Sequence, residues 1–194
     1  MAIRDSIQIG DLRLKADNKV VTDFNDSAVK QVITDMIDTM RQNQLIGLAA
    51  PQIGENLKIF VTEPRETPNR SADQADELRV YINPTIINFS TEEVEIYEGC
   101  GSVLKATLFG PVIRPREITI EAFDQNGDKF SLTCDGILAR VIQHEYDHLS
   151  GIEFTEKISD YKKLMSVEFY LERIKMLPEH LAAQKINKII ATKL

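Results

Sequence analysis

The sequence is poor in cysteine and has no long apolar run, and these two shortages exclude whole classes of protein. Its 194 residues include only Cys100 and Cys134, too few for the disulfide framework of a small secreted domain. No stretch approaches the roughly 18–20 apolar residues of a transmembrane helix. The N-terminus lacks the apolar core of a secretory signal and carries Asp5 and Asp11, which argues against a transit peptide. We therefore expect a cytoplasmic protein without a membrane partner.

A strong excess of positive charge is also missing, although the charge that is present lies unevenly. The formal net charge is −7, which argues against a polyanion binder, and we expect no specific DNA partner. Residues 157–194 nevertheless contain eight Lys and Arg against four Asp and Glu, so a segment of charge +4 follows a body of charge −11. Such a basic segment can dock on an acidic partner, or it can be the solvated face of a helix.

Secondary-structure patterns predict an α+β fold. Apolar residues recur every three to four positions over 25–44, which is typical of an amphipathic helix. Runs at 57–63, 78–84 and 92–98 are typical of strands, and two alternating runs around the turn DQNGD predict a hairpin over 117–134. A second helix is predicted from Gly136 to a stop at Gly151. The last 35 residues show helical patterns interrupted near Pro178.

The pattern HExxH lies within this second predicted helix, in the stretch QHEYDH (143–148). His144 and His148 are four residues apart, so both imidazoles lie on one helix face and can bind one metal ion. Glu145 can then reach a metal-activated water molecule rather than the metal itself. The chain has three histidines, and two of them are in this pattern. The sequence therefore predicts a catalytic metal site.

Two histidines do not complete a catalytic site, which usually has three protein ligands and one open position. Cys100 is one candidate, because thiolates bind borderline and soft metals and the flanking glycines allow close approach of the backbone. His180, Glu153 and Glu156 are other candidates, although His180 lies in a polar, helical tail. Cys134 lies in an alternating strand pattern and is expected to be a core residue.

Three segments of the chain resemble, in order, the three motifs of the peptide deformylase family. They are GLAAPQ (47–52), EGCGS (98–102) and QHEYDHLSG (143–151), and the family patterns are G-x-G-L-A-A-x-Q, E-G-C-L-S and Q-H-E-x-D-H-L. The resemblance covers nearly the whole chain. It implies a single domain over 1–194, with antiparallel sheets around a central helix that carries HExxH, an N-terminal helix and a C-terminal helical tail over 160–194.

The resemblance also implies an activity and a metal. Family members hydrolyse the N-formyl group from the formyl-methionine of newly synthesised polypeptides and release formate. The implied ligands are Cys100, His144 and His148. The usual ion is Fe(II), and Zn, Ni or Co is compatible with the same donors in a purified sample. Relatives with a long final helix suggest a further partner, the ribosome, which the basic C-terminal tail would contact.

Further roles follow from the same resemblance. Glu145 would accept a proton from the attacking water and later deliver it to the amine, and the Gln52 side chain and the Gly101 N–H would stabilise the oxyanion. The methionine pocket would be formed by Ile46, Ile96, Ile137 and Val141, and Gly47 would bind the substrate backbone. Glu98, Arg114 and Asp147 would support the ligands, with Glu98 and Arg114 as the preferred ion pair.

Among the departures from the family pattern, two lie within its motifs near the substrate groove. Leu45 replaces the first glycine of G-x-G, and Gly101 replaces the leucine of E-G-C-L-S. Two other functions are therefore considered, a metalloamidase with a different N-acyl substrate and a catalytically poor metal-binding relative. The presence of both Glu145 and Gln52 argues against the second, since a purely structural metal site needs neither.

Overall fold

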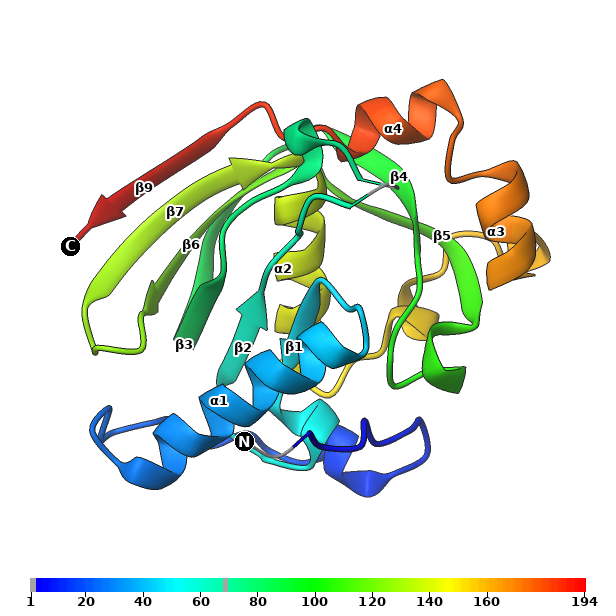
Figure 1. Ribbon diagram of the computed structural model, residues 1–194. Coiled ribbons are helices and arrows are strands. Elements are labelled where there is room, and N and C mark those ends of the chain that lie inside the picture. The colour runs from blue at the N-terminus through cyan, green and yellow to red at the C-terminus, as the bar shows by residue number, and fades with distance from the viewer. Residues whose placement is uncertain (1–2, 68–69) are drawn as a thin grey trace.

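Two antiparallel sheets enclose one helix in the computed structural model, which describes residues 3–67 and 70–194 (Figure 1). The larger sheet has the order β1-β2-β3-β6-β7-β9 and the smaller has the order β4-β5-β8. The first sheet comprises β1 (Gly47–Ala49), β2 (Ile59–Thr62), β3 (Arg79–Phe89), β6 (Glu117–Phe123), β7 (Lys129–Asp135) and β9 (Ile189–Lys193). The second comprises β4 (Glu93–Glu98), β5 (Leu108–Pro115) and β8 (Met165–Ser166). The predicted α+β fold is confirmed.

Helices connect and cover these sheets. The α-helices are α1 (Ser27–Gln42), α2 (Gly136–Leu149), α3 (Val167–Arg173) and α4 (Pro178–Gln184). Short 3-10 helices span Leu12–Lys15, Ala50–Ile53, Ala72–Gln74, Leu104–Ala106, Phe154–Lys157 and Tyr161–Lys163. In Figure 1, α2 lies between the larger sheet and the strands β4 and β5, so it is the central helix of the fold.

The strand β2 is apolar on both faces because a helix covers each of them. Ile59 and Val61 belong to one core cluster with the apolar face of α1, whereas Phe60 belongs to another with α2. Successive side chains of a strand point to opposite faces, so α1 and α2 pack on opposite sides of this part of the sheet. The uninterrupted apolar run IFV therefore follows from burial on both faces.

The start of α2 is fixed by close backbone contact. Gly136 has φ +61°, and a Cβ atom there would lie 2.2 Å from the carbonyl oxygen of Lys185. Only glycine avoids both the unfavourable φ and the collision. The preceding residue, Asp135, accepts hydrogen bonds from the N–H groups of Asn187 and Lys188 at 2.7 and 2.9 Å. The helix that carries HExxH is thereby packed against the C-terminal segment.

That C-terminal segment has the interrupted helical pattern expected near Pro178, but it does not remain helical to its end. It contains α3 and α4, and after Gln184 it turns into the strand β9, which pairs with β7 in the register Ile189↔Cys134 to Lys193↔Phe130. Pro178 is the first residue of α4, a position where its missing N–H costs nothing, so the helical pattern is broken at the residue where the sequence predicts it. The strand covers the edge of β7 and becomes the outer strand of the larger sheet.

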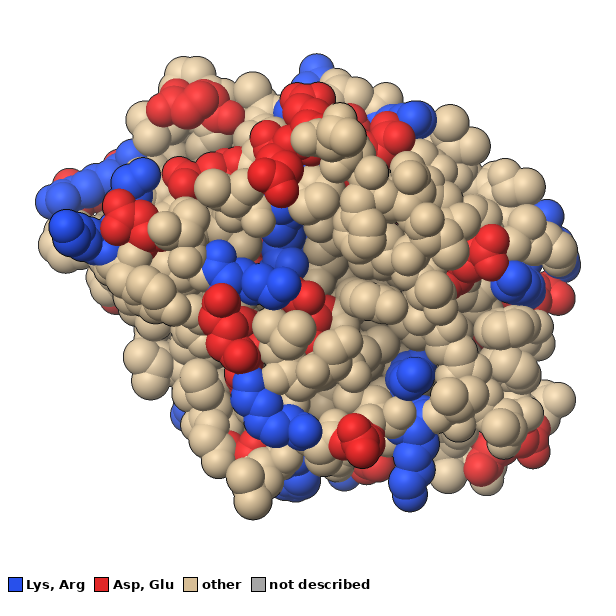
Figure 2. All heavy atoms as spheres, turned by 180° about the vertical axis from the view of Figure 1, so that it is seen from behind, with Lys and Arg blue, Asp and Glu red and all other residues tan. Residues whose placement is uncertain are grey.

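The uneven charge of the sequence is largely balanced within the fold. Five of the eight basic side chains of residues 157–194 form ion pairs with acidic residues of the body. These pairs are Lys157–Asp147, Lys163–Glu95, Lys185–Asp73, Lys188–Glu117 and Lys193–Asp128, with distances between 2.7 and 4.0 Å. Figure 2 shows one face of the molecule, on which basic and acidic side chains lie beside one another. The basic segment therefore complements its own acidic body.

Candidate metal centre

Three potential ligands from two distant segments converge at one end of α2. The helix supplies His144 and His148, and the turn after β4 supplies Cys100. Their ligand atoms lie within 4.8 Å of one another, and Cys100 Sγ is 3.3 Å from His148 Nε2. The ligand atoms of a tetrahedral ion lie about 3.5 Å apart, so one thiolate and two imidazoles at this spacing fit a single divalent metal ion.

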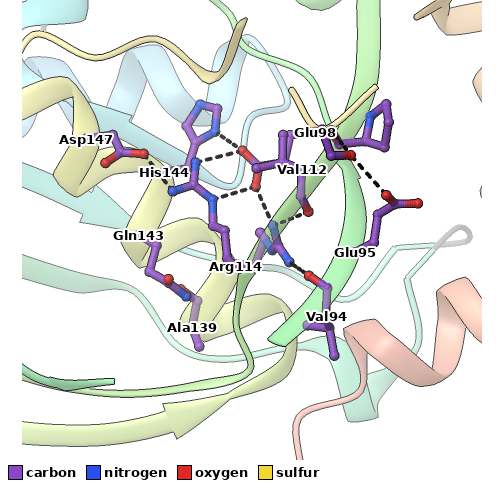
Figure 3. A network of polar contacts seen from close by, with 12 residues as sticks. Val94, Glu95, Glu98, Val112, Arg114, Ala139, Gln143, His144 and Asp147 are labelled. Atoms are coloured by element: carbon purple, nitrogen blue, oxygen red, sulfur yellow. Dashed lines mark hydrogen bonds and ion pairs between the residues drawn. The ribbon is translucent and has the colours of Figure 1, made fainter. Parts of the chain in front are cut away.

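A buried carboxylate orients one of these imidazoles. Glu98 Oε2 accepts a hydrogen bond from His144 Nδ1 at 2.8 Å (Figure 3), which leaves Nε2 for a metal. Burial opposes ionisation of Glu98, but Arg114, the hydrogen bond from His144 and Arg140 together hold its pKa well below its usual range. The carboxylate thus remains a negatively charged acceptor beside the ligand.

Two arginines hold Glu98 in turn. Arg114 donates to both carboxylate oxygens at 2.8 and 3.1 Å, and to Asp147 at 2.6 Å. Arg140 donates to Glu98 Oε1 at 2.8 Å and to the carbonyl oxygens of Val112 and Val94. The structure thus brings together Glu98, Arg114 and Asp147 as expected. The sequence analysis did not include Arg140 among the site residues. Its position within the apolar run ILARVIQ could have indicated a buried charge that needs an acidic partner.

Glu145 faces the cavity with one oxygen that has no partner. The residue is 3% exposed, and within the described residues its Oε2 makes no hydrogen bond. Burial raises the pKa of Glu145 to about 7, so the group can both accept and donate a proton near neutral pH. An unpaired carboxylate oxygen in this position is suited to a water molecule or a substrate amine beside the metal.

The glycine at position 47 is required by Glu145. A Cβ atom on Gly47 would lie 2.5 Å from Glu145 Oε1 and 2.5 Å from Val141 Cγ2. Any side chain at this point of β1 would displace the carboxylate from the cavity. The strand β1 also forms an edge of the larger sheet, so the backbone beside the carboxylate is available for another chain.

Gln52 presents its amide nitrogen to the same cavity. Its Oε1 accepts a hydrogen bond from the Ala49 N–H at 2.7 Å. Because the oxygen is engaged, the Nε2 group points toward Cys100 Sγ and Ser102 Oγ, each at 3.4 Å. The amide is therefore oriented in advance as a donor, which is what stabilisation of an oxyanion requires.

A cavity of about 430 Å³ adjoins the candidate ligands. Ile46, Gly47, Ile137 and Val141, expected at the substrate pocket, all line it, as do Gln52, Cys100, Gly101, His144 and Glu145. Ile96, also expected there, does not line it. Its side chain is 1% exposed because it points into the core, and Tyr97, the next residue on β4, lines the cavity instead.

The other candidate ligands lie elsewhere. His180 packs against the rings of Tyr97 and Tyr170, at centroid distances of 6.4 and 5.7 Å. Glu153 and Glu156 both pair with Lys15, and Cys134 is fully buried in the core cluster around α2. In the part of the chain that the structure describes, the group of Cys100, His144 and His148 is the one cluster suited to a metal.

The two departures from the family pattern meet in space. A Cβ atom on Gly101 would lie 3.0 Å from Leu45 Cδ1, and both residues line the cavity. The leucine at 45 therefore covers the space into which a side chain at 101 would extend. In the family pattern a leucine at position 101 provides an apolar side chain here. In this chain Leu45 provides it from the opposite wall of the cavity.

The turn that carries Gly101 is held by a residue that sequence reasoning missed. Gln8 Nε2 donates to the Gly101 carbonyl oxygen at 2.8 Å, and Gln8 Oε1 accepts from the Lys105 N–H at 3.0 Å. The turn continues into Leu104, Lys105 and Ala106, which have φ of 48°, 53° and 59°. This left-handed conformation is unfavourable for residues with side chains, so outside contacts such as those of Gln8 are needed to maintain it.

Comparison with known proteins decides the family. The model of the family described as Polypeptide deformylase matches residues 3–164. The chain belongs to this family. Deformylases remove the N-formyl group from nascent peptides with a divalent metal ion, and the chain is accordingly a metal-dependent hydrolase.

Individual deformylases support this assignment. Peptide deformylase 1 of Clostridium perfringens is 42% identical over 156 residues, which are 80% of this chain and 98% of that protein. The crystal structure of peptide deformylase from Thermotoga maritima is similar with a TM-score of 0.72 and 31% identity, and covers 82% of this chain and 100% of its own. The enzyme from Ehrlichia chaffeensis in complex with actinonin has a TM-score of 0.74 at 32% identity, over 90% and 97% of the two chains.

We predict that replacing both Leu45 and Gly101 with the residues of the family pattern destabilises the protein less than replacing Gly101 alone. Gly101→Leu alone places a side chain against Leu45, and such overpacking typically costs about 1–3 kcal/mol. The double variant Leu45→Gly/Gly101→Leu should recover most of the loss, with a coupling energy of about 0.5–3 kcal/mol. Urea unfolding of the four proteins of this cycle measures the coupling. Additive costs would show that the contact between 45 and 101 does not matter.

A second prediction concerns the ligand set. Cys100→Ala should lose most of the bound metal, because two histidines remain from a three-ligand site. Cys134→Ala is the matched control, since it removes the other buried thiol and should keep the metal. Metal content after anaerobic gel filtration, measured by atomic emission, separates the two variants. Equal loss from both would contradict the assignment of Cys100.

Proposed function

We propose that the chain removes the formyl group from the N-terminal formyl-methionine of new polypeptides, acting as a single domain with one divalent ion at Cys100, His144 and His148. The observation that carries the proposal is the position of Glu145. Its unpaired carboxylate oxygen faces the cavity beside three converging ligand atoms. A hydrolase needs a proton acceptor at that point, whereas a purely structural metal site does not.

The reaction breaks the bond between the formyl carbon and the methionine nitrogen, and yields formate and a free amine. A divalent ion, when bound, would polarise the formyl carbonyl and lower the pKa of a water molecule. Glu145 accepts the proton of the attacking water and delivers it to the departing nitrogen. The amide of Gln52 and the N–H of Gly101 donate hydrogen bonds to the oxyanion.

Substrate binding uses the cavity and the free edge of β1. An extended peptide can add to this edge through backbone hydrogen bonds at Gly47, which directs the first side chain toward Ile46, Ile137 and Val141. These residues line the cavity, and their apolar surface suits an unbranched methionine side chain. Both the backbone and the first side chain of the peptide are thus recognised next to Glu145.

Fe(II) is the proposed ion in the cell, with Zn, Ni or Co able to occupy the same donors in a purified sample. We also propose that the protein acts in the cytoplasm. None of the described helices has the length and apolar character needed to cross a membrane.

The function is tested with protein prepared anaerobically with Fe(II) and assayed on formyl-Met and acetyl-Met tripeptides. We expect hydrolysis of the formyl peptide, a decrease of about 10²–10⁴-fold for Glu145→Gln and about 10²–10³-fold for Gln52→Ala. Both variants should keep their metal, because neither residue is a ligand. Preference for the acetyl peptide would instead favour a metalloamidase with another substrate, and no turnover of either would favour a catalytically poor relative.

We further propose that the basic C-terminal segment contributes to docking at the ribosome. Lys162 and Arg173 support this, since they are exposed basic side chains of the segment without an acidic partner among the described residues. Lys162→Glu/Arg173→Glu should reduce co-sedimentation with ribosomes and leave hydrolysis of short peptides unchanged. The control is Lys193→Glu at the far edge of the larger sheet. Unchanged co-sedimentation of the double variant would refute this docking site.

A further inference from the structure

One wall of the active cavity comes from the part of the chain that follows the family match. The matched range ends at residue 164, yet the cavity that Cys100 and His144 line is also lined by Val167, Tyr170, Leu171, Lys175 and Gln184. These residues belong to α3, to α4 and to the turn between them. The cavity therefore has features that the general family pattern does not determine.

Aromatic stacking holds this wall in position. The ring of Tyr170 lies parallel to that of Phe109, with centroids 4.2 Å apart and planes at 4°. His180 packs edge-on against Tyr170 at 5.7 Å. Just before α3, β8 pairs with β5 in the register Leu108↔Ser166. The wall is thus a packed part of the protein, and its side chains have defined positions relative to the metal ligands.

The wall carries one positive charge, that of Lys175, and a separate loop brings a second one, that of Arg70, to the same cavity. Lys175 and Arg70 both line the cavity and both are partly buried. Burial lowers the pKa of Lys175, and the charge of Arg70 lowers it further, as expected for two cations that line one cavity. Burial is also the main factor that lowers the pKa of Arg70.

Neither cation has an acidic partner within residues 3–67 and 70–194. The side chain of Arg70 donates a hydrogen bond from Nη1 to the Arg65 carbonyl oxygen at 3.3 Å, and Lys175 forms no ion pair with a described residue. The cavity has two acidic lining residues, Glu98 and Glu145. Glu98 already accepts hydrogen bonds from Arg114, Arg140 and His144. Glu145 lies beside the candidate metal ligands.

We propose that Arg70 and Lys175 form a subsite for a carboxylate side chain within the first three residues that follow formyl-methionine in the substrate. Two partly buried cations without a counter-ion are unfavourable, and a carboxylate between them relieves their repulsion. The arginine fork suits a carboxylate in particular. An extended peptide advances about 3.3 Å per residue, so its early side chains pass along this cavity. The inference rests on the proposed function.

The test compares formyl-Met peptides that end in an amide and carry Glu, Gln or Lys at one of the three following positions. At one position we expect kcat/KM to be about 3–10-fold higher for Glu than for Gln, mainly through KM, with Lys lowest. The advantage of Glu should shrink as salt is raised, because the cations are only partly buried. Arg70→Met and Lys175→Met should each reduce it, whereas Lys175→Arg should keep it.

Lys162→Met is the matched control, since it removes an exposed lysine outside the cavity and should keep the full preference for Glu. Circular dichroism checks that each variant is folded. No preference for Glu at any position, or an equal preference in wild type and both Met variants, would overturn the subsite. Failure to hydrolyse the neutral Gln peptide would instead count against the proposed function.

Discussion

The buried carboxylate of Glu98 is the interaction on which the metal centre depends. It joins three elements, because Glu98 ends β4, Arg114 lies on β5, and Arg140 and His144 lie on α2. Two arginines balance Glu98 and Asp147, so the network is close to neutral although it is almost completely buried. A buried charge of this kind is tolerated only when all its partners are present. The same contacts that stabilise the junction of sheet and helix therefore also orient a metal ligand.

Local patterns in the sequence were sufficient for much of the fold and for part of the site. The helices α1 and α2 and the hairpin of β6 and β7 follow from short-range periodicity and turn residues, and the two histidines follow from helix geometry. Cys100 could be selected from the other candidate ligands only through the resemblance of three motifs, because nothing local links it to a helix 44 residues later. Ile96 does not line the cavity, whereas its neighbour Tyr97 does, and a strand pattern alone does not tell which of two neighbours faces a cavity.

Long-range contacts account for what the sequence did not reveal. Gln8 contacts Gly101 across 93 positions of the chain, and no periodic pattern encodes such a pair. The strand β9 pairs with β7, and this partner is present only in the assembled sheet. The covering of Gly101 by Leu45 likewise requires the folded backbone, although each departure is visible separately in the sequence. The charge composition suggested an acidic partner or a solvated helix face for residues 157–194. Most basic side chains of this segment instead pair with acidic residues of the same chain.

The strand β1 has a consequence for the breadth of substrates. Its free edge is three residues long and passes directly into a 3-10 helix that contains Pro51, so few backbone groups are available to an added strand. Backbone hydrogen bonds carry no information about side chains. Selection among the residues that follow the first one is therefore left to the side chains that line the cavity. A short edge also gives little template for unwanted strand pairing between copies of the protein.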